Sequence, residues 1–390
     1  MSIKKINVIL FSILITLVMS NITLFANVNL LDLDDVDAEC AAIIDMETGR
    51  LLYGKNENKK QAIASTTKIM TSLITLEQDD IDSYFEVDPK AIKIEGTSMG
   101  LLEGDKVSLR TLAVGMLLPS GNDAAEVAAI KIAGSRKKFL DLMNEKAKSF
   151  GCNNTHFATT SGLDDDDHYS TASDMVKIAK HALLNEDFAK ICNQEYETIE
   201  YGNPPYKRTL KNHNKLLTKY DYCIGVKTGY TDNAGKCLVS AAKKDDICLI
   251  IATLNNKNNM YETHENMYEQ AFNKLSKTKL TANLPVNNVK VVGGETIGVP
   301  VETKFNLEIP LIKGEENKLK HKINLKKFLL APVKKGSVIG EINYYIDENK
   351  IVSNPITTMM DVKAKSKNSF WEKILKNFYI NKMKKDNKFI

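Results

Sequence analysis

Apolar residues along this chain recur at two spacings, which predict its helices and strands. The apolar residues Ile69, Met70 and Leu73 follow the period of one helix face. A helix is therefore expected to begin close to Ser65, just before this run. Similar patterns predict further helices over residues 108–117, 123–133, 135–149, 171–184, 186–193 and 261–276.

Strand patterns lie on both sides of these helices. Residues 39–54 are predicted to form a β-hairpin that turns at Thr48 and Gly49. The run from Ile247 to Ala252 is continuously apolar, as expected of a central strand. The pattern predicts an α/β (α+β) domain over residues 39–276, with an antiparallel sheet flanked by helices. Its other strands are expected over 196–201, 222–229 and 236–243.

The pattern changes after this domain. Short apolar or alternating runs, separated by glycine and proline, predict a small all-β domain over residues 284–362. This stretch carries no catalytic grouping. Residues 279–283 are the predicted joint between the two domains.

The two ends of the chain have compositions of their own. Two lysines, an apolar run and then Ala26 predict a signal peptide over residues 1–26, although a permanent membrane helix is an alternative. Residues 366–390 combine many lysines with an aromatic and aliphatic face. Such a basic amphipathic helix favours an anionic membrane surface, and a disordered tail or a helix packed on the β domain are alternatives. An exported, membrane-attached protein is expected.

Composition excludes several classes of function. The chain has 390 residues, is 43% hydrophobic and carries a net charge of +4, which gives no reason to expect a nucleic-acid partner. Its six cysteines and six histidines are scattered without metal-ligand spacing. We therefore expect no metal and no cofactor. A run of four aspartates, 164–167, is interpreted as a solvated loop.

Candidate chemistry begins at Ser65. Lys68 lies three residues further on, and so on the same helix face, where an unprotonated amine could take the serine proton. Free N–H groups at the helix start could hold an oxyanion. Each residue alone has a simpler reading, because a serine at this place is commonly a helix cap. The motif gains weight only from partners elsewhere in the chain.

Two such partners follow in order. Ser120 and Asn122 lie in a loop that opens a predicted helix, and Lys227, Thr228 and Gly229 end a predicted strand. The order Ser-Xaa-Xaa-Lys, Ser-Xaa-Asn, Lys-Thr-Gly resembles that of the serine penicillin-interacting enzymes. Within them the chain resembles the low-molecular-mass penicillin-binding proteins that act as D-alanyl-D-alanine carboxypeptidases. Further similar segments are 43–45, 48–49, 120–124, 161–164, 169–172, 214–217 and 225–235.

The resemblance implies a serine-type carboxypeptidase that removes the terminal D-alanine from peptidoglycan peptide stems and is inhibited by β-lactams. Ser65 would attack the carbonyl between the two D-alanines, with Lys68 as its base. Backbone N–H groups of Ser65 and Tyr230 would form the oxyanion hole. Ser120 would pass a proton towards the leaving amine, and Asn122 would orient Lys68 or the substrate amide.

The resemblance also implies how the substrate is held. Lys227 and Thr228 would meet its terminal carboxylate, and the Lys227 charge would favour a neutral Lys68. Gly229 would leave room for the peptide along the strand edge. One position departs from the family, because Met260 stands where many relatives carry an arginine that helps to hold the carboxylate. Lys257 or His264 could fill that role.

Three alternative functions share parts of this pattern. A D,D-endopeptidase acting on peptidoglycan cross-links would use the same residues. A class A β-lactamase needs a glutamate-activated water, but no Glu-Xaa-Xaa-Leu-Asn segment lies between Ser120 and Lys227. A non-catalytic wall-binding protein is disfavoured by the complete set of motifs.

Overall fold

The computed structural model describes residues 30–281, 284, 286–303 and 307–365. The predicted signal peptide and the predicted C-terminal tail therefore lie outside the described residues. Within the described ranges, no helix is both long enough and apolar enough to cross a membrane.

A five-stranded antiparallel sheet forms the centre of the first domain, in the order β2-β1-β9-β8-β7. β9 lies in the middle of this sheet, which confirms that residues 247–254 form a central strand. The predicted hairpin and antiparallel sheet are also confirmed. The strands are β1 (Ala38–Asp45), β2 (Leu51–Lys55), β7 (Cys223–Thr231), β8 (Gly235–Lys244) and β9 (Ile247–Asn256).

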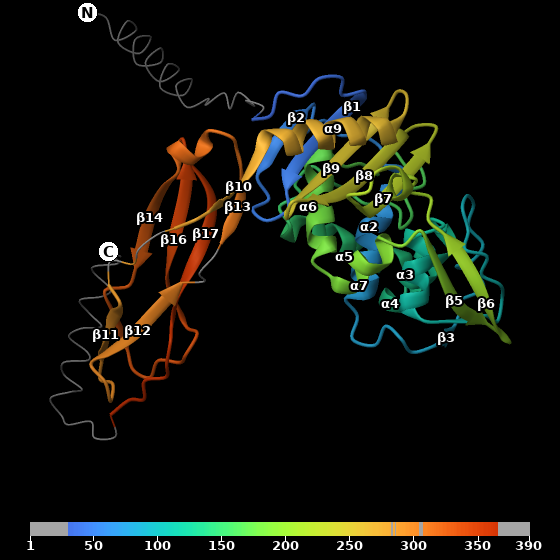
Figure 1. Cartoon of the computed structure of the whole chain (residues 1–390). Helices are drawn as coiled ribbons and strands as arrows, with labels where there is room; N and C mark the ends of the chain where they lie inside the picture. The colour runs from blue at the N-terminus through green and yellow to red at the C-terminus, as the bar shows by residue number, and fades with distance from the viewer. Residues whose placement is uncertain (1–29, 282–283, 285, 304–306, 366–390) are drawn as a thin grey trace, which may run out of the picture.

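Helices cover both faces of this sheet (Figure 1). In β9, Ile250 belongs to the large core shared with the helices on one face, whereas Leu249 and Ile251 belong to a second core with α9 (Met260–Lys274). This alternation explains why β9 is apolar at every position. The first face carries α2 (Lys68–Leu76), α3 (Leu109–Leu117), α4 (Asn122–Ala133), α5 (Arg136–Ser149), α6 (Ala172–Leu183) and α7 (Glu186–Cys192).

Helix starts follow the local sequence. The side chains of Ser108, Ser135 and Thr171 accept hydrogen bonds from the first turns of α3, α5 and α6. The strands β5 (Tyr196–Gly202) and β6 (Pro205–Lys211) form a hairpin. The sequence predicts β5 but not β6, because β6 is mostly polar and exposed. The short α8 (Leu216–Lys219) and the two-residue strands β3 (Phe85–Glu86) and β4 (Lys106–Val107) complete this part.

An all-β body follows α9. Its main sheet has the order β14-β16-β17-β12-β11-β15, and β10 (Leu275–Lys279) pairs separately with β13 (Glu308–Ile312). The other strands are β11 (Asn288–Val292), β12 (Gly298–Thr303), β14 (Lys320–Leu325), β15 (Phe328–Leu330), β16 (Val338–Ile346) and β17 (Asn349–Thr358).

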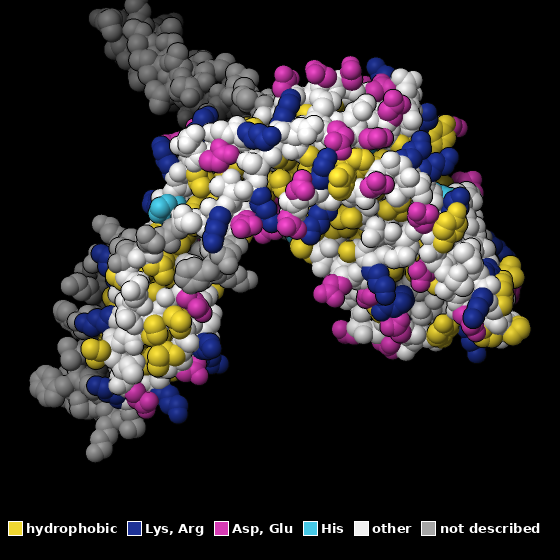
Figure 2. Space-filling model, viewed as in Figure 1, with side chains coloured by type: hydrophobic (Ala, Val, Ile, Leu, Met, Phe, Trp, Pro, Cys, Tyr) yellow, Lys and Arg dark blue, Asp and Glu magenta, His cyan; other side chains and the backbone are white. Residues whose placement is uncertain are grey.

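The passage between the two bodies differs from the prediction. The final helix ends at Lys274, not at residue 276, and Leu275 begins β10 directly. Lys279, the first residue of the predicted joint, is thus already paired with Glu308 of the all-β body. A second contact joins the bodies, because Arg50 forms a two-pronged ion pair with Glu315 (2.8 and 2.5 Å) in the 3-10 turn Glu315–Lys318. Basic and acidic side chains are otherwise interspersed over the face in Figure 2.

Candidate active site

Ser65 lies at the start of the predicted helix, in a 3-10 turn (Ala64–Thr67) that leads directly into α2. The turn is held by its own hydroxyls, because Thr66 donates to the Ile63 carbonyl (2.6 Å) and Thr67 to the Ala64 carbonyl (2.8 Å). Ser65 itself is half-buried and lines a cleft. This local hydrogen bonding fixes the backbone beside its hydroxyl.

Lys68 is the first residue of α2, and its side chain is fully buried. Its Nζ lies 2.8 Å from Ser65 Oγ, 2.7 Å from Asn122 Oδ1 and 2.8 Å from the Ser161 carbonyl oxygen. Burial holds the pKa of Lys68 well below its ordinary value, and the charge of Lys227 lowers this pKa further. The amine is therefore disposed to be neutral beside Ser65.

Asn122 connects two loops to this lysine. Its Nδ2 donates to the Glu95 carbonyl (2.7 Å), while its Oδ1 faces Lys68. A Cβ at Gly96 would lie 2.6 Å from that Nδ2, so the close approach requires glycine. Ser120 precedes α4 with a left-handed backbone (φ 65°) and lines the cleft. Both motif residues thus converge on the surroundings of Ser65.

The third motif lies on β7. Lys227 is buried and its Nζ donates to the Thr228 carbonyl (2.9 Å); burial lowers the pKa of Lys227 to about 7. A Cβ on Gly229 would lie 2.9 Å from the Ser65 amide nitrogen and 3.0 Å from that of Thr66. The glycine therefore gives room to the turn that carries Ser65, a reason the sequence did not reveal.

A cleft of about 380 Å³ joins these elements. Six of the predicted site residues line it, whereas Lys68 and Lys227 are buried. The sequence did not single out Gly96, Thr97 and His213, because they come from loops distant in the chain. The cleft is lined by Ser65, Gly96, Thr97, Ser120, Asn122, Gly162, Leu163, His213, Thr228, Gly229, Tyr230, Thr231, Met260 and Tyr261.

His168, at the end of the acidic loop, contacts the turn that carries Ser65. Its Nδ1 accepts from the backbone N–H groups of Ala158 and Thr159 (3.1 and 3.2 Å), so its Nε2 carries the proton and donates to Thr67 Oγ1 (2.7 Å). Burial lowers the pKa of His168 to about 4, which keeps this ring neutral. The sequence offered no signal for this contact.

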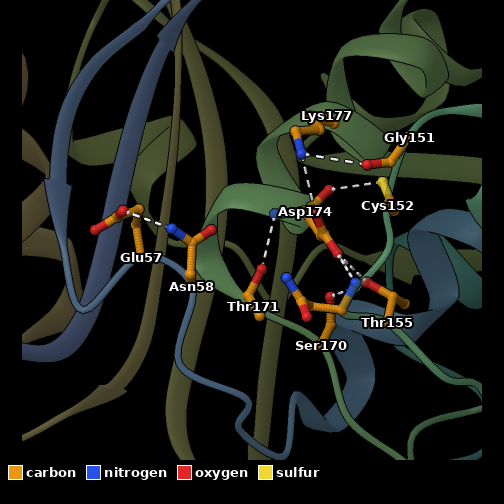
Figure 3. Close-up of polar contacts among 10 residues, drawn as sticks. Glu57, Asn58, Gly151, Cys152, Thr155, Ser170, Thr171, Asp174 and Lys177 are labelled. Atoms are coloured by element: carbon orange, nitrogen blue, oxygen red, sulfur yellow. Dashed lines mark hydrogen bonds and ion pairs between the residues drawn. The ribbon is translucent and has the colours of Figure 1, made fainter. Parts of the chain in front are cut away.

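A second set of hydrogen bonds holds the segment before Ser65, and it begins at Asp174 on α6 (Figure 3). The buried Asp174 carboxylate accepts from the Asn154 N–H and the Thr155 hydroxyl (2.9 Å each). Thr155 Oγ1 lies 2.8 Å from Ser170 Oγ, and the Ser170 backbone exchanges hydrogen bonds with Gln61 (2.8 and 3.0 Å). The segment that leads to Ser65 is therefore tied to the start of α6.

The structure also shows the surroundings of Met260, the position at which an arginine is expected from the family resemblance. Met260 lines the cleft at the start of α9. His264 does not fill the role suggested for it, because its buried ring is bonded to Ser240 Oγ and Thr253 Oγ1 (2.7 Å each). Burial lowers the pKa of His264 to about 3, so it supplies no charge. Lys257 is exposed and is not among the residues that line the cleft.

The known proteins that resemble this chain agree with the family resemblance of its motifs. Residues 27–258 match the family model described as D-alanyl-D-alanine carboxypeptidase, and residues 276–364 match the penicillin-binding protein 5 C-terminal domain. The D-alanyl-D-alanine carboxypeptidase DacF of Bacillus subtilis is 33% identical, over 84% of this chain and 86% of the relative. DacC of Escherichia coli is 30% identical, over 87% and 88%. The crystal structure of penicillin binding protein 5 from Haemophilus influenzae is 29% identical, covers 85% of this chain and 99% of its own, and has a TM-score of 0.66.

Proposed function

Because this chain belongs to the D-alanyl-D-alanine carboxypeptidase family of penicillin-binding proteins, we propose that it removes the terminal D-alanine through an ester on Ser65. The protein is a serine-type D-alanyl-D-alanine carboxypeptidase, a hydrolase that acts on peptidoglycan peptide stems and binds β-lactams. The assignment of chemical roles to its residues is our proposal. One observation carries it: the buried Lys68 amine lies 2.8 Å from the Ser65 hydroxyl.

The three contacts of Lys68 support its role as the base. A neutral amine has two N–H groups and one lone pair. Its N–H groups can donate to Asn122 Oδ1 and the Ser161 carbonyl, which leaves the lone pair to accept from the Ser65 hydroxyl. The lowered pKa of Lys68 favours this neutral form. The amine is thus oriented to take the proton as Ser65 attacks.

The chemistry then runs in two steps. Ser65 Oγ bonds to the carbonyl carbon between the two D-alanines, while the N–H groups of Ser65 and Tyr230 hold the oxygen of the tetrahedral intermediate. The C–N bond breaks, and the proton taken by Lys68 reaches the leaving amine by way of Ser120. Water next attacks the ester while Lys68 accepts its proton, and this proton passes to Ser65 Oγ as the acyl group leaves. During the first step, Lys227 and Thr228 hold the carboxylate of the terminal D-alanine until this residue leaves.

Incubation of purified muropeptides with protein truncated after residue 365 tests the reaction. We expect pentapeptides to lose one D-alanine, because the cleft and its motifs lie within the first domain. Mass spectrometry distinguishes this product from cleaved dimers. Dimer cleavage without loss of D-alanine from pentapeptides would contradict carboxypeptidase action and identify an endopeptidase.

Met260→Arg is expected to raise kcat/KM for a D-Ala-D-Ala peptide about ten-fold or more. Met260 lines the cleft, and one charged hydrogen bond to the carboxylate is worth roughly 1.5–3 kcal/mol. Steady-state kinetics measures the gain. Met360→Arg is the matched control, since this half-exposed methionine lies in the all-β body. Equal kcat/KM values for Met260→Arg and wild type would show that no carboxylate contact is lacking.

The enzyme acts in the cell wall, on the extracytoplasmic side of the membrane. We propose further that residues 1–26 are removed as a signal peptide and that residues 366–390 attach the mature protein to the membrane surface. The support is compositional: lysines accompany an aromatic and aliphatic face in this tail.

Deletion of residues 366–390 should move the protein from the membrane fraction to the soluble fraction while penicillin labelling persists. Cell fractionation followed by labelling with a fluorescent penicillin measures both properties. A mature, tail-less protein that still sediments with membranes would refute attachment through the tail.

A further inference from the structure

A second cavity of about 470 Å³ adjoins the active-site cleft. Lys211, His213, Asn214, Lys215 and Lys219 are among the residues that line it, and we call it the lysine pocket. It lies where β6 ends and α8 follows. The lysine pocket has no role in the proposed catalytic steps, so its chemistry needs a separate account.

His213 joins the lysine pocket to the cleft, because this exposed residue lines both cavities. The Tyr261 hydroxyl, from a residue that also lines the cleft, donates to the His213 carbonyl (3.1 Å). Lys219 Nζ lies 5.8 Å from the centre of the Tyr261 ring. A peptide bound in the cleft could therefore continue past His213 into the lysine pocket.

The charge in the lysine pocket is unbalanced. Lys211, Lys215 and Lys219 face one acidic residue of the lining, Glu195. Among the ion pairs of the described residues, none involves these three lysines. Such a surface attracts anions, because several like charges beside a cavity raise the local concentration of the opposite charge.

Asn214 gives a second, independent indication of a ligand. Its side chain is 2% exposed, and its Oδ1 accepts from the Leu216 N–H (3.1 Å), which fixes the orientation of the amide. Its Nδ2 has no acceptor among the described residues. Leaving a buried donor unpaired is costly, so a carboxylate that reached this amide would gain a hydrogen bond.

We propose that the lysine pocket binds a carboxylate of the peptidoglycan peptide, separate from the terminal carboxylate held beside Thr228. This inference rests on the proposed function. Stem peptides contain acidic residues, and the carboxylate can come from the stem that is cut or from a second stem cross-linked to it. In either case the lysine pocket favours an acidic wall peptide over a short neutral one.

The double variant Lys215→Gln/Lys219→Gln tests the lysine pocket against three substrates. The first is an N-acylated D-Ala-D-Ala peptide with no carboxylate except the terminal one, the second a monomeric pentapeptide muropeptide, and the third a cross-linked dimer with a pentapeptide stem. The ratio of kcat/KM for an acidic substrate to kcat/KM for the neutral peptide should fall about ten-fold, as expected for the loss of two exposed charge pairs. A fall with both muropeptides identifies the cut stem, and a fall with the dimer alone identifies the second stem.

Lys137→Gln/Lys138→Gln on α5 is the matched control, because it removes the same charge from exposed residues that do not line either cavity. Asn214→Asp is a second test, since the carboxylate keeps the acceptor for Leu216 but repels an anion. The ratio of kcat/KM for an acidic substrate to kcat/KM for the neutral peptide should also fall in Asn214→Asp. If both pocket variants had the same kcat/KM ratio as wild type, the proposal that the lysine pocket binds a carboxylate would be wrong. The proposed carboxypeptidase activity would still stand. A wild-type protein that cleaves none of the three substrates would instead refute the proposed function.

Discussion

Ser65→Ala is expected to abolish covalent labelling by a fluorescent penicillin, because no other described hydroxyl lies within hydrogen-bonding distance of the Lys68 amine. The hydroxyl of Ser65 lines the cleft, and its backbone is fixed by Thr66 and Thr67. Since the turn is held by these neighbours, the variant should keep the wild-type fold. Gel fluorescence after incubation with the penicillin measures the adduct, and thermal unfolding measures the fold.

Ser72→Ala is the matched control for this experiment. Ser72 is a fully buried serine on the same helix, and its Oγ has no hydrogen-bond partner among the described residues. Its removal should leave labelling intact. Persistent labelling of Ser65→Ala would show that another residue forms the ester.

Lys68→Ala should lower the rate of penicillin acylation by about a hundred- to ten-thousand-fold, the usual contribution of a positioned general base. The serine would remain in place but lose the group that accepts its proton. The change also leaves Asn122 Oδ1 and the Ser161 carbonyl without their lysine donor, at roughly 1–3 kcal/mol each. Stopped-flow acylation gives the rate, and Lys138→Ala, an exposed lysine on α5, is the control.

The pH dependence separates a base from a purely structural lysine. Burial holds the pKa of Lys68 below its ordinary value, so the wild-type acylation rate should rise with pH as the amine loses its proton. Lys68→Ala should lack this rise. Lys227, with a pKa of about 7, loses its charge above that pH, so KM for a peptide should increase there. An unchanged rise in Lys68→Ala would assign it to another group.

The sequence predicted the parts of this protein that depend on local patterns. Ile69, Met70 and Leu73 face the large core at helical spacing, as expected from their positions. Ile250 and its neighbours are apolar throughout because helices cover both faces of β9. Ser65 and Lys68 meet because Lys68 lies three positions after Ser65, on the same face.

Other features depend on contacts between distant segments. The sequence suggests His264 for carboxylate binding, yet His264 shares its helix face with Tyr268 and Phe272, at intervals of four residues, and is buried against the sheet. That spacing was a usable signal. By contrast, Gly96 and His213 reach the cleft from loops whose position only the tertiary fold determines.

The direct passage from α9 into β10 has a mechanical consequence. Because β10 follows α9 without intervening residues and Arg50 is paired with Glu315, we expect the all-β body to keep a constant orientation relative to the catalytic domain. A body of constant length and angle would set the distance between the active-site cleft and a surface at its far end. We therefore expect the length of this body to decide which stem peptides the cleft can reach.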